Sequence, residues 1–203
     1  MSGFETPPAV AAAMERARAE GFTISSEDCV GRLLAVLAAA VPAGGRVLEV
    51  GTGVGMGTAW IVTGLGDRRD VELVTVERDP SLVEAVRAWP WPAFVRLLQA
   101  DVLDVLGRLG TFDLVFPDSR AGKYLGFDRT LEALRPGGIL LVDDMKPVPA
   151  AGEWHELAAE LRRTVLSHPE LQAIAMDWCS GVILAARRRP GSHGENQAAE
   201  SDR

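Results

Sequence analysis

The segment that decides the fold runs from residue 47 to residue 57 and reads VLEVGTGVGMG. A short strand-like run leads into four glycines at alternate positions, Gly51, Gly53, Gly55 and Gly57. Glycine lets the chain turn sharply after a strand and lets a ligand approach the backbone closely. In open parallel sheets, ligands bind beyond the carboxyl ends of the strands. The segment therefore predicts a nucleotide-like ligand at the first strand-to-helix turn.

The rest of the chain alternates short apolar runs with longer helical segments. The predicted strands are residues 46–51, 72–77, 95–101, 112–118 and 138–144. Each is nearly continuous in Val, Leu, Ile or Phe, which is typical of parallel strands covered on both faces. A helix through residues 154–165 follows, and then strands 171–178 and 182–187, joined by the short turn Cys179-Ser180-Gly181. Such a tight connection predicts an antiparallel hairpin.

These patterns predict an α/β fold: a seven-stranded, mostly parallel sheet with a C-terminal antiparallel hairpin and helices on both faces. We expect a single domain over residues 1–189, with helices at 8–20 and 27–41 and a core at 46–188. Residues 190–203 are polar and lack periodicity, so a disordered tail is expected there.

Composition favours a soluble protein, since 47% of the residues are hydrophobic and 24% are charged. The net charge of −7 disfavours nucleic acid and anionic membrane surfaces as partners. The start of the chain lacks the pattern of a secretory signal, and the apolar run 30–42 is too short to span a membrane, so a cytoplasmic location is expected. Cys29 and Cys179 lack metal-ligand spacing, and we expect two separate buried thiols.

The glycine segment does not fit the dinucleotide motif Gly-x-Gly-x-x-Gly. The third glycine position holds Met56 in one register and Thr58 in the other. Glu49 instead stands two residues before Gly51, and the resulting Glu-x-Gly-x-Gly-x-Gly resembles the first motif of Rossmann-like class I methyltransferases. This resemblance implies S-adenosylmethionine as the cofactor.

Acidic residues at the ends of the next two strands suit the remainder of that cofactor. Glu77 can accept the hydroxyl hydrogens of a ribose, and Asp101, between Ala100 and Val102, can accept the amino group of adenine. Either acid can instead cap backbone amides or remain solvated. The expected cofactor-binding residues are Glu49, Gly51, Thr52, Gly53, Gly55, Gly57, Glu77, Arg78, Ala100, Asp101, Val102 and Asp118.

Three further carboxylates follow the fourth and fifth predicted strands: Asp118, Asp143 and Asp144. Clustered carboxylates repel one another unless a cation lies between them, and their hard oxygens suit Mg²⁺ or Ca²⁺. Residues 112–118 with Tyr124, together with residues 136–144, resemble the catechol and caffeoyl-CoA O-methyltransferase family, and the similarity extends over about residues 26–187. In that family an acid at the first position and an Asp-Asn pair hold a metal, which implies the same role for these three residues.

The chain departs from the family pattern at two positions. Asp144 stands where the family has an asparagine, and Ala121 stands where it has the lysine that acts as general base. Lys123 follows two positions later, after the flexible Gly122, and can replace that base or else remain solvated or bind an acidic acceptor. Trp89, Trp91 and Trp154 can line an aromatic acceptor pocket, although packing in the core is the simpler interpretation.

The leading hypothesis is a metal-assisted methyltransferase acting on a hydroxyl of a small molecule. Because the usual base is missing, a metal-independent methyltransferase for a nitrogen or carboxylate acceptor is the second hypothesis. A non-catalytic protein that binds the cofactor is the third. Homodimers are common among related enzymes, and the apolar helix at 27–41 can provide the contact surface.

Overall fold

The computed structural model describes residues 5–23, 25–146 and 152–190. Seven strands form one sheet in the order β3-β2-β1-β4-β5-β7-β6. The strands are β1 (Arg46–Val50), β2 (Glu72–Glu77), β3 (Val95–Gln99), β4 (Phe112–Pro117), β5 (Leu134–Val142), β6 (Leu171–Met176) and β7 (Val182–Arg187). Strands β1 to β5 are parallel, and β7 pairs antiparallel with both β5 and β6. The predicted mostly parallel sheet with a terminal antiparallel hairpin is confirmed.

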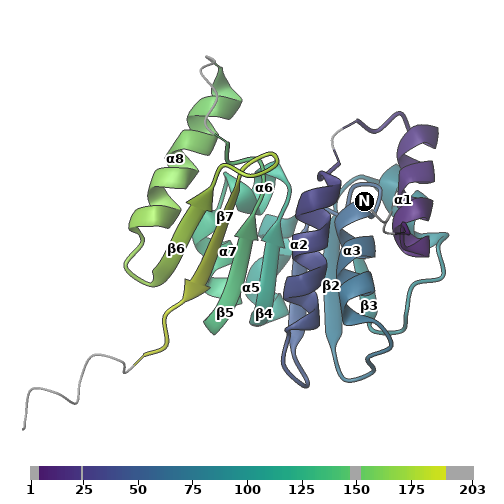
Figure 1. The fold of residues 1–203 in the computed structure, drawn as a ribbon, viewed down its shortest axis with the longest axis horizontal. Helices are drawn as coiled ribbons and strands as arrows, with labels where there is room; N and C mark the ends of the chain where they lie inside the picture. Colours follow the sequence, from purple (N-terminus) through teal and green to yellow (C-terminus); the bar gives the residue numbers. More distant parts are fainter. Residues whose placement is uncertain (1–4, 24, 147–151, 191–203) are drawn as a thin grey trace, which may run out of the picture.

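Helices cover both faces of this sheet (Figure 1). They are α1 (Pro8–Ala19), α2 (Asp28–Ala39), α3 (Met56–Leu65), α4 (Pro80–Arg87), α5 (Val102–Leu109), the short α6 (Arg120–Lys123), α7 (Phe127–Ala133) and α8 (Glu153–Ser167). Helices α2 and α3 share one buried cluster with the sheet, and α5, α7 and α8 share the cluster on the other face. Helix α1 packs outside α3.

The apolar strand residues build two cores because successive side chains of a strand point to opposite faces. In β1, Val47 joins the cluster under α2 and α3, whereas Leu48 and Val50 join the cluster under α5 and α7. All three are fully buried. Glu49 lies on the same face as Val47 and is therefore directed at α3.

The order of the strands reverses between β1 and β4, and the two strands are hydrogen-bonded neighbours. Chain segments that leave the carboxyl ends of these strands therefore diverge toward opposite sides of the sheet. This is where ligands bind in open α/β sheets. The glycine-rich turn follows β1, and Asp118 follows β4.

The fifth strand is longer than the sequence predicts. It begins at Leu134 rather than at residue 138, and its pairing with β4 shifts register between Phe112 and Leu114. Pro136 and Gly137 lie inside this irregular stretch, and Gly137 has a positive φ of 82°. Turn-forming residues inside the strand conceal its beginning from sequence patterns. Residues 191–203, where a disordered tail is expected, lie outside the described residues.

The expectation of two separate thiols is wrong. Cys29 in α2 and Cys179 in the turn between β6 and β7 form a disulfide, with Cα atoms 6.5 Å apart and a sequence separation of 150. Both cysteines are partly exposed rather than buried. Spacing along the chain cannot reveal such a pair, because the parallel sheet brings the two segments together.

Within the described part of the chain, no helix combines the length and the apolar character needed to cross a membrane.

Candidate functional site

The glycine-rich turn after β1 requires glycine for steric reasons. Gly51, Gly53 and Gly55 have φ values of 94°, 53° and 80°, a region that other residues rarely adopt. A Cβ atom on Gly51 would lie 2.7 Å from the Cβ of Ser119 and 2.9 Å from the carbonyl oxygen of Asp118. The turn after β1 therefore packs directly against the segment that follows β4, and the predicted cofactor loop and acidic cluster are neighbours.

Glu49, in β1, lies buried under this turn and is linked to it by hydrogen bonds through threonine hydroxyls. Its carboxylate is 1% exposed, and Oε2 accepts hydrogen bonds from the hydroxyls of Thr58 in α3 and Thr75 in β2. Thr52, in the turn itself, is hydrogen-bonded to the Thr75 hydroxyl at 2.6 Å. Burial raises the pKa of Glu49 to about 8 and outweighs the two hydroxyl donors, which act in the opposite direction. The structure thus assigns Glu49 a supporting position, and its expected contact with the cofactor stays a prediction.

Gly57 makes room for this buried carboxylate. A Cβ atom at this position would lie 2.2 Å from Oε1 of Glu49. The fourth glycine of the motif therefore serves the supporting network under the turn, while the first three shape the turn itself.

Glu77 connects the end of β2 to the same turn. Its Oε2 accepts a hydrogen bond of 2.9 Å from the backbone N–H of Gly53, and its Oε1 accepts from the N–H groups of Arg78 and Asp79. At the end of β3, Asp101 caps α5 by accepting from the N–H of Leu103 at 2.9 Å. Capping is the structural alternative that the sequence left open for these acids. It does not exclude a ligand, because an ionised carboxylate offers about four lone-pair sites.

Asp118, Asp143 and Asp144 converge at the ends of β4 and β5. Each offers a carboxylate oxygen, and these atoms lie within 4.8 Å of one another. Asp143 is 1% exposed, whereas the side chain of Asp144 is 64% exposed. The predicted acidic cluster is therefore present, with one buried member and one that faces solvent.

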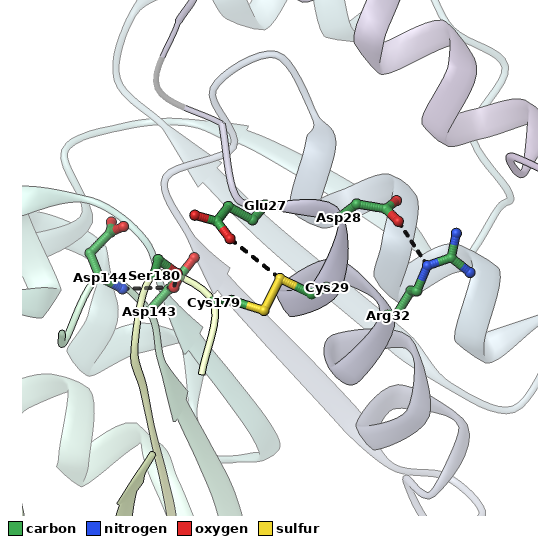
Figure 2. The surroundings of a disulfide bond; sticks show 8 residues. All are labelled: Glu27, Asp28, Cys29, Arg32, Asp143, Asp144, Cys179 and Ser180. Carbon is green, nitrogen blue, oxygen red and sulfur yellow. Dashed lines mark hydrogen bonds and ion pairs between the residues drawn. A yellow bond between two sulfur atoms is a disulfide. The ribbon is translucent and has the colours of Figure 1, made fainter. Parts of the chain in front are cut away.

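Two serines hold the cluster in place, and no sequence pattern predicts either of them. The Ser26 hydroxyl, just before α2, donates to Oδ2 of Asp118 at 3.0 Å. The Ser180 hydroxyl, in the turn between β6 and β7, donates to Oδ1 of Asp143, which also accepts from the backbone N–H of Asp144 at 2.7 Å (Figure 2). Both serines come from segments remote in sequence, so local motifs could not identify them.

Lys123 lies inside the cluster, as the sequence allowed. Its Nζ is 3.3 Å from Oδ2 of Asp144 and 4.0 Å from Oδ1 of Asp118, and its side chain is 3% exposed. The positive φ of Gly122, 85°, turns the chain so that the lysine reaches this position. Burial acts to lower the pKa of Lys123, but the charges of Asp118 and Asp144 outweigh it and raise the pKa above its ordinary value. Lys123 is therefore a buried ammonium ion.

The cluster carries more negative charge than this ammonium balances. Burial raises the pKa of Asp118 to about 7, the charges of Asp143 and Asp144 add to the rise, and Lys123 and Ser26 oppose it. The pKa of Asp143 is also raised, mainly by burial. Carboxylates whose charged forms are disfavoured in this way are stabilised by an added cation.

The donor set fits a hard divalent cation. Three aspartate carboxylates supply only oxygen ligands, which is the chemistry that Mg²⁺ and Ca²⁺ prefer. Among the described residues, one other group, Glu27 with Cys29 and Cys179, also brings ligand atoms within 4.8 Å of one another. The disulfide engages both of its sulfur atoms, so it does not resemble a metal site.

Of Trp89, Trp91 and Trp154, the last lies near the acidic cluster. Trp154 in α8 is 55% exposed and makes an edge contact with the ring of Tyr124, with the ring centroids 6.0 Å apart. The Nζ of Lys123 lies 5.3 Å from the centroid of the same Tyr124 ring. Trp89 and Trp91 instead pack against Arg16 of α1.

Comparison with known families and proteins supports a methyltransferase. Residues 48–145 match the model of a methyltransferase domain, and residues 5–89 match the model of protein-L-isoaspartate (D-aspartate) O-methyltransferases. A relative from Mycolicibacterium vanbaalenii, named as an O-methyltransferase without an acceptor, is 33% identical over 88% of this chain and 83% of its own length. A catechol O-methyltransferase from Mycobacterium tuberculosis is 32% identical over 83% of this chain and 81% of its own length.

Solved structures share the architecture. A cofactor-bound protein from M. tuberculosis has a TM-score of 0.79, is 27% identical, and the match covers 93% of both chains. An O-methyltransferase of tomaymycin synthesis from Streptomyces achromogenes, solved with S-adenosylmethionine, has a TM-score of 0.76 at 22% identity, with 91% of this chain and 92% of that chain covered. At that identity the second likeness shows the fold alone.

Proposed function

The chain belongs to the S-adenosylmethionine-dependent O-methyltransferases, and from this premise we propose that it methylates a hydroxyl of a small molecule with the help of a divalent cation. The observation that carries the proposal is the convergence of Asp118, Asp143 and Asp144 beside the glycine-rich turn. The turn would hold the methyl donor, and the acidic cluster would hold the cation and the acceptor. The direct packing of Gly51 against the residues after β4 supports such a juxtaposition of donor and acceptor.

The proposed reaction is a single displacement. The bond from the methyl carbon to the acceptor oxygen forms as the bond to the sulfonium sulfur breaks, and the bonding electron pair stays on sulfur. The proton of the acceptor hydroxyl passes to solvent water. The chain contributes by holding the reactants in line, since alignment of two bound reactants is itself a large part of such catalysis. Glu77 and Asp101 would bind the ribose and the adenine, and Thr52 and Arg78 belong to the same proposed cofactor site.

The proposed metal ligands are Asp118, Asp143 and Asp144. A bound divalent cation would lower the pKa of an acceptor hydroxyl and orient its oxygen. Ser26 and Ser180 would keep two of these carboxylates in position through the hydrogen bonds described above. Groups that hydrogen-bond to metal ligands usually serve to hold those ligands in the orientation that binds the metal.

Lys123 is better suited to electrostatic stabilisation than to the base role expected from the sequence. A general base must be neutral before it takes a proton, and the raised pKa of Lys123 keeps it charged. An ammonium ion at this position favours the ionised form of an acceptor hydroxyl. We therefore assign Lys123 to stabilising the acceptor oxygen.

The test is transfer of an isotope-labelled methyl group from S-adenosylmethionine to catechol, with Mg²⁺ and with excess chelator. Asp143→Asn should remove the Mg²⁺-dependent activity, whereas Asp67→Asn, an exposed residue in the turn between α3 and β2, should not. Loss of turnover in chelator and its return with Mg²⁺ would support the proposal. Turnover that is unchanged in excess chelator would remove the metal from the mechanism while leaving the methyltransferase in place.

One observation favours a second candidate function. Because the ammonium of Lys123 already lies near two of the acids, the cluster holds a cation of its own and the enzyme can act without a metal. The acceptor would then be an amine or a carboxylate. Chelator-resistant transfer to such acceptors, with no transfer to catechol, would support this function over the first.

We propose a small-molecule acceptor rather than nucleic acid or a membrane, and a cytoplasmic enzyme. We also propose a homodimer formed through α2, where the apolar side chain of Val36 is 66% exposed. Light scattering of the purified protein and of Val36→Asp tests the dimer, and a monomer at micromolar concentration for the unchanged protein would exclude it.

A further inference from the structure

The disulfide joins two segments that both contact the acidic cluster (Figure 2). Cys29 lies in the first turn of α2, three residues after Ser26. Cys179 lies in the turn between β6 and β7, directly before Ser180. Ser26 donates to Asp118 and Ser180 donates to Asp143. The S–S bond thus connects the two segments that carry these serines, whose hydroxyls position the two less exposed carboxylates of the site.

The turn that carries Cys179 is firmly attached to the chain after β5. The N–H groups of Met145 and Lys146 donate to the carbonyl oxygens of Gly181 and Ser180 at 2.8 and 3.0 Å. Gly181 approaches so closely that a Cβ atom there would lie 2.2 Å from the backbone nitrogen of Lys146. This side of the disulfide is held by the backbone, with or without the S–S bond.

Within the described residues, the side that carries Cys29 has fewer such attachments at the cluster. Ser26 precedes α2, in a stretch without regular secondary structure, and a single side-chain hydrogen bond connects it to Asp118. A covalent link from Cys29 to the firmly held turn restricts how far residues 25–28 can move from the site. The disulfide therefore fixes the less firmly held segment to the more firmly held one.

We propose that Cys29–Cys179 is a reversible redox switch that controls the geometry of the acidic cluster; the proposal concerns regulation of the same site and rests on the proposed function. In the oxidised state Ser26 stays on Asp118 and the cluster is ordered for the cation and the acceptor. In the reduced state residues 25–28 separate from the turn, and Asp118 loses its hydroxyl donor.

The redox step is thiol–disulfide exchange with a small or protein dithiol as the reductant. A thiolate of the reductant attacks one sulfur, the S–S bond breaks, and the other cysteine leaves as a thiolate. The second thiol of the reductant then displaces the first cysteine, so that the protein gains two electrons and two protons and the reductant becomes a disulfide. Both cysteines are partly exposed, which makes such an attack feasible. Disulfides in a reducing cytoplasm are usually transient, catalytic or redox-sensing rather than structural.

The experiment compares oxidised and reduced full-length protein with the Cys29→Ser/Cys179→Ser double variant. Alkylation under denaturing conditions followed by mass spectrometry establishes the redox state of each sample. Three quantities are measured: Mg²⁺-dependent methyl transfer, binding of S-adenosylhomocysteine, and hydrogen exchange at residues 25–28 and 177–181.

We expect reduction to lower kcat/KM by up to about 100-fold, which is the scale for displacing a reacting group by about 1 Å. Exchange at residues 25–28 should rise, and binding of S-adenosylhomocysteine should stay within about twofold, because the glycine-rich turn and the ends of β2 and β3 provide that site. The double variant should behave as the reduced protein and should not respond to dithiothreitol. In Ser26→Ala the disulfide should still form, but the oxidised protein should have the low activity of the reduced one.

Any of three results would overturn the switch. The first is that the disulfide fails to form in the presence of oxidised glutathione. The second is that activity and hydrogen exchange stay the same although mass spectrometry shows the change of redox state, and the third is that the double variant still responds to dithiothreitol. Failure of the proposed function has a different signature. If turnover resists chelator, the metal is excluded while the oxidised and reduced rates can still be compared, and if no acceptor is methylated, hydrogen exchange alone decides the question.

Discussion

Replacing Glu49 with glutamine should abolish a large pH dependence of stability. Burial raises the pKa of Glu49 in the folded protein to about 8, from an ordinary value of 4.5. Between these two values the unfolded chain releases a proton that the folded chain retains, so the free energy of unfolding falls as pH rises. Glutamine preserves the shape of the side chain and an acceptor for the hydroxyls of Thr58 and Thr75, but it does not titrate.

The size of the effect follows from the two pKa values. A separation of about 3.5 pH units corresponds to a contribution of about 5 kcal/mol, which is present below pH 4.5 and lost as pH rises to about 8. Asp118 and Asp143 also have raised pKa values and titrate in both proteins, so the difference between the two pH profiles comes mainly from Glu49 and its interaction with Asp118. The variant should therefore gain about 5 kcal/mol relative to the unchanged protein between pH 4.5 and pH 9.

The assay is urea unfolding of both proteins at half-unit intervals of pH, with circular dichroism as the signal. Glu84→Gln, at an exposed position of α4, is the matched control and should leave the pH profile unchanged. Parallel profiles for Glu49→Gln and the unchanged protein would refute the argument. A variant that loses stability relative to the unchanged protein as pH rises would show that Glu49 is ionised and stabilised by its hydroxyl donors.

Three further predictions concern the two halves of the site. Gly51→Ala should destabilise the protein by about 1–3 kcal/mol and weaken binding of S-adenosylhomocysteine, because the new Cβ atom would clash with Ser119 at a positive φ; calorimetry showing an unchanged Kd would contradict this. Ser180→Ala should raise the Mg²⁺ concentration for half-maximal activity by about 10- to 100-fold without affecting S-adenosylhomocysteine binding, as expected for a group that orients a metal ligand. Lys123→Met leaves the acids without their ammonium partner, so Mg²⁺ should raise its Tm more than that of the unchanged protein, and an equal rise would argue against a shared cation site.

Much of the architecture could be predicted because it depends on local patterns. Continuous apolar runs followed by acids or glycines identify the parallel strands, and the short turn at residues 179–181 identifies the hairpin. The beginning of β5 could not be predicted, since Pro136 and Gly137 normally end a strand and here lie within an irregular part of one. The local preference of these two residues is for a turn, whereas pairing with β4 makes them part of a strand.

The residues of the candidate site also fall into those that local sequence patterns predict and those that they do not. Asp118, Asp143 and Asp144 could be predicted to converge because each follows a strand of the same parallel sheet. The position of Lys123 depended on the backbone of Gly122, which sequence allows but does not decide. Ser26 and Ser180 reach Asp118 and Asp143 from the start of α2 and from the β6–β7 turn, and the Cys29–Cys179 bond joins these same two segments. A single sequence contains no periodicity or spacing that reveals such long-range contacts.

The Cys29–Cys179 bond also makes a covalent ring of most of the chain. The ring contains the five parallel strands and β6, whereas α1 and β7 lie on the two ends that leave it. A protease that cuts once within the ring leaves a single molecule, held together by the S–S bond, and only a reductant releases the two fragments. A single band on a non-reducing gel is therefore no proof of an intact backbone for this protein, and limited proteolysis must be analysed both with and without reductant.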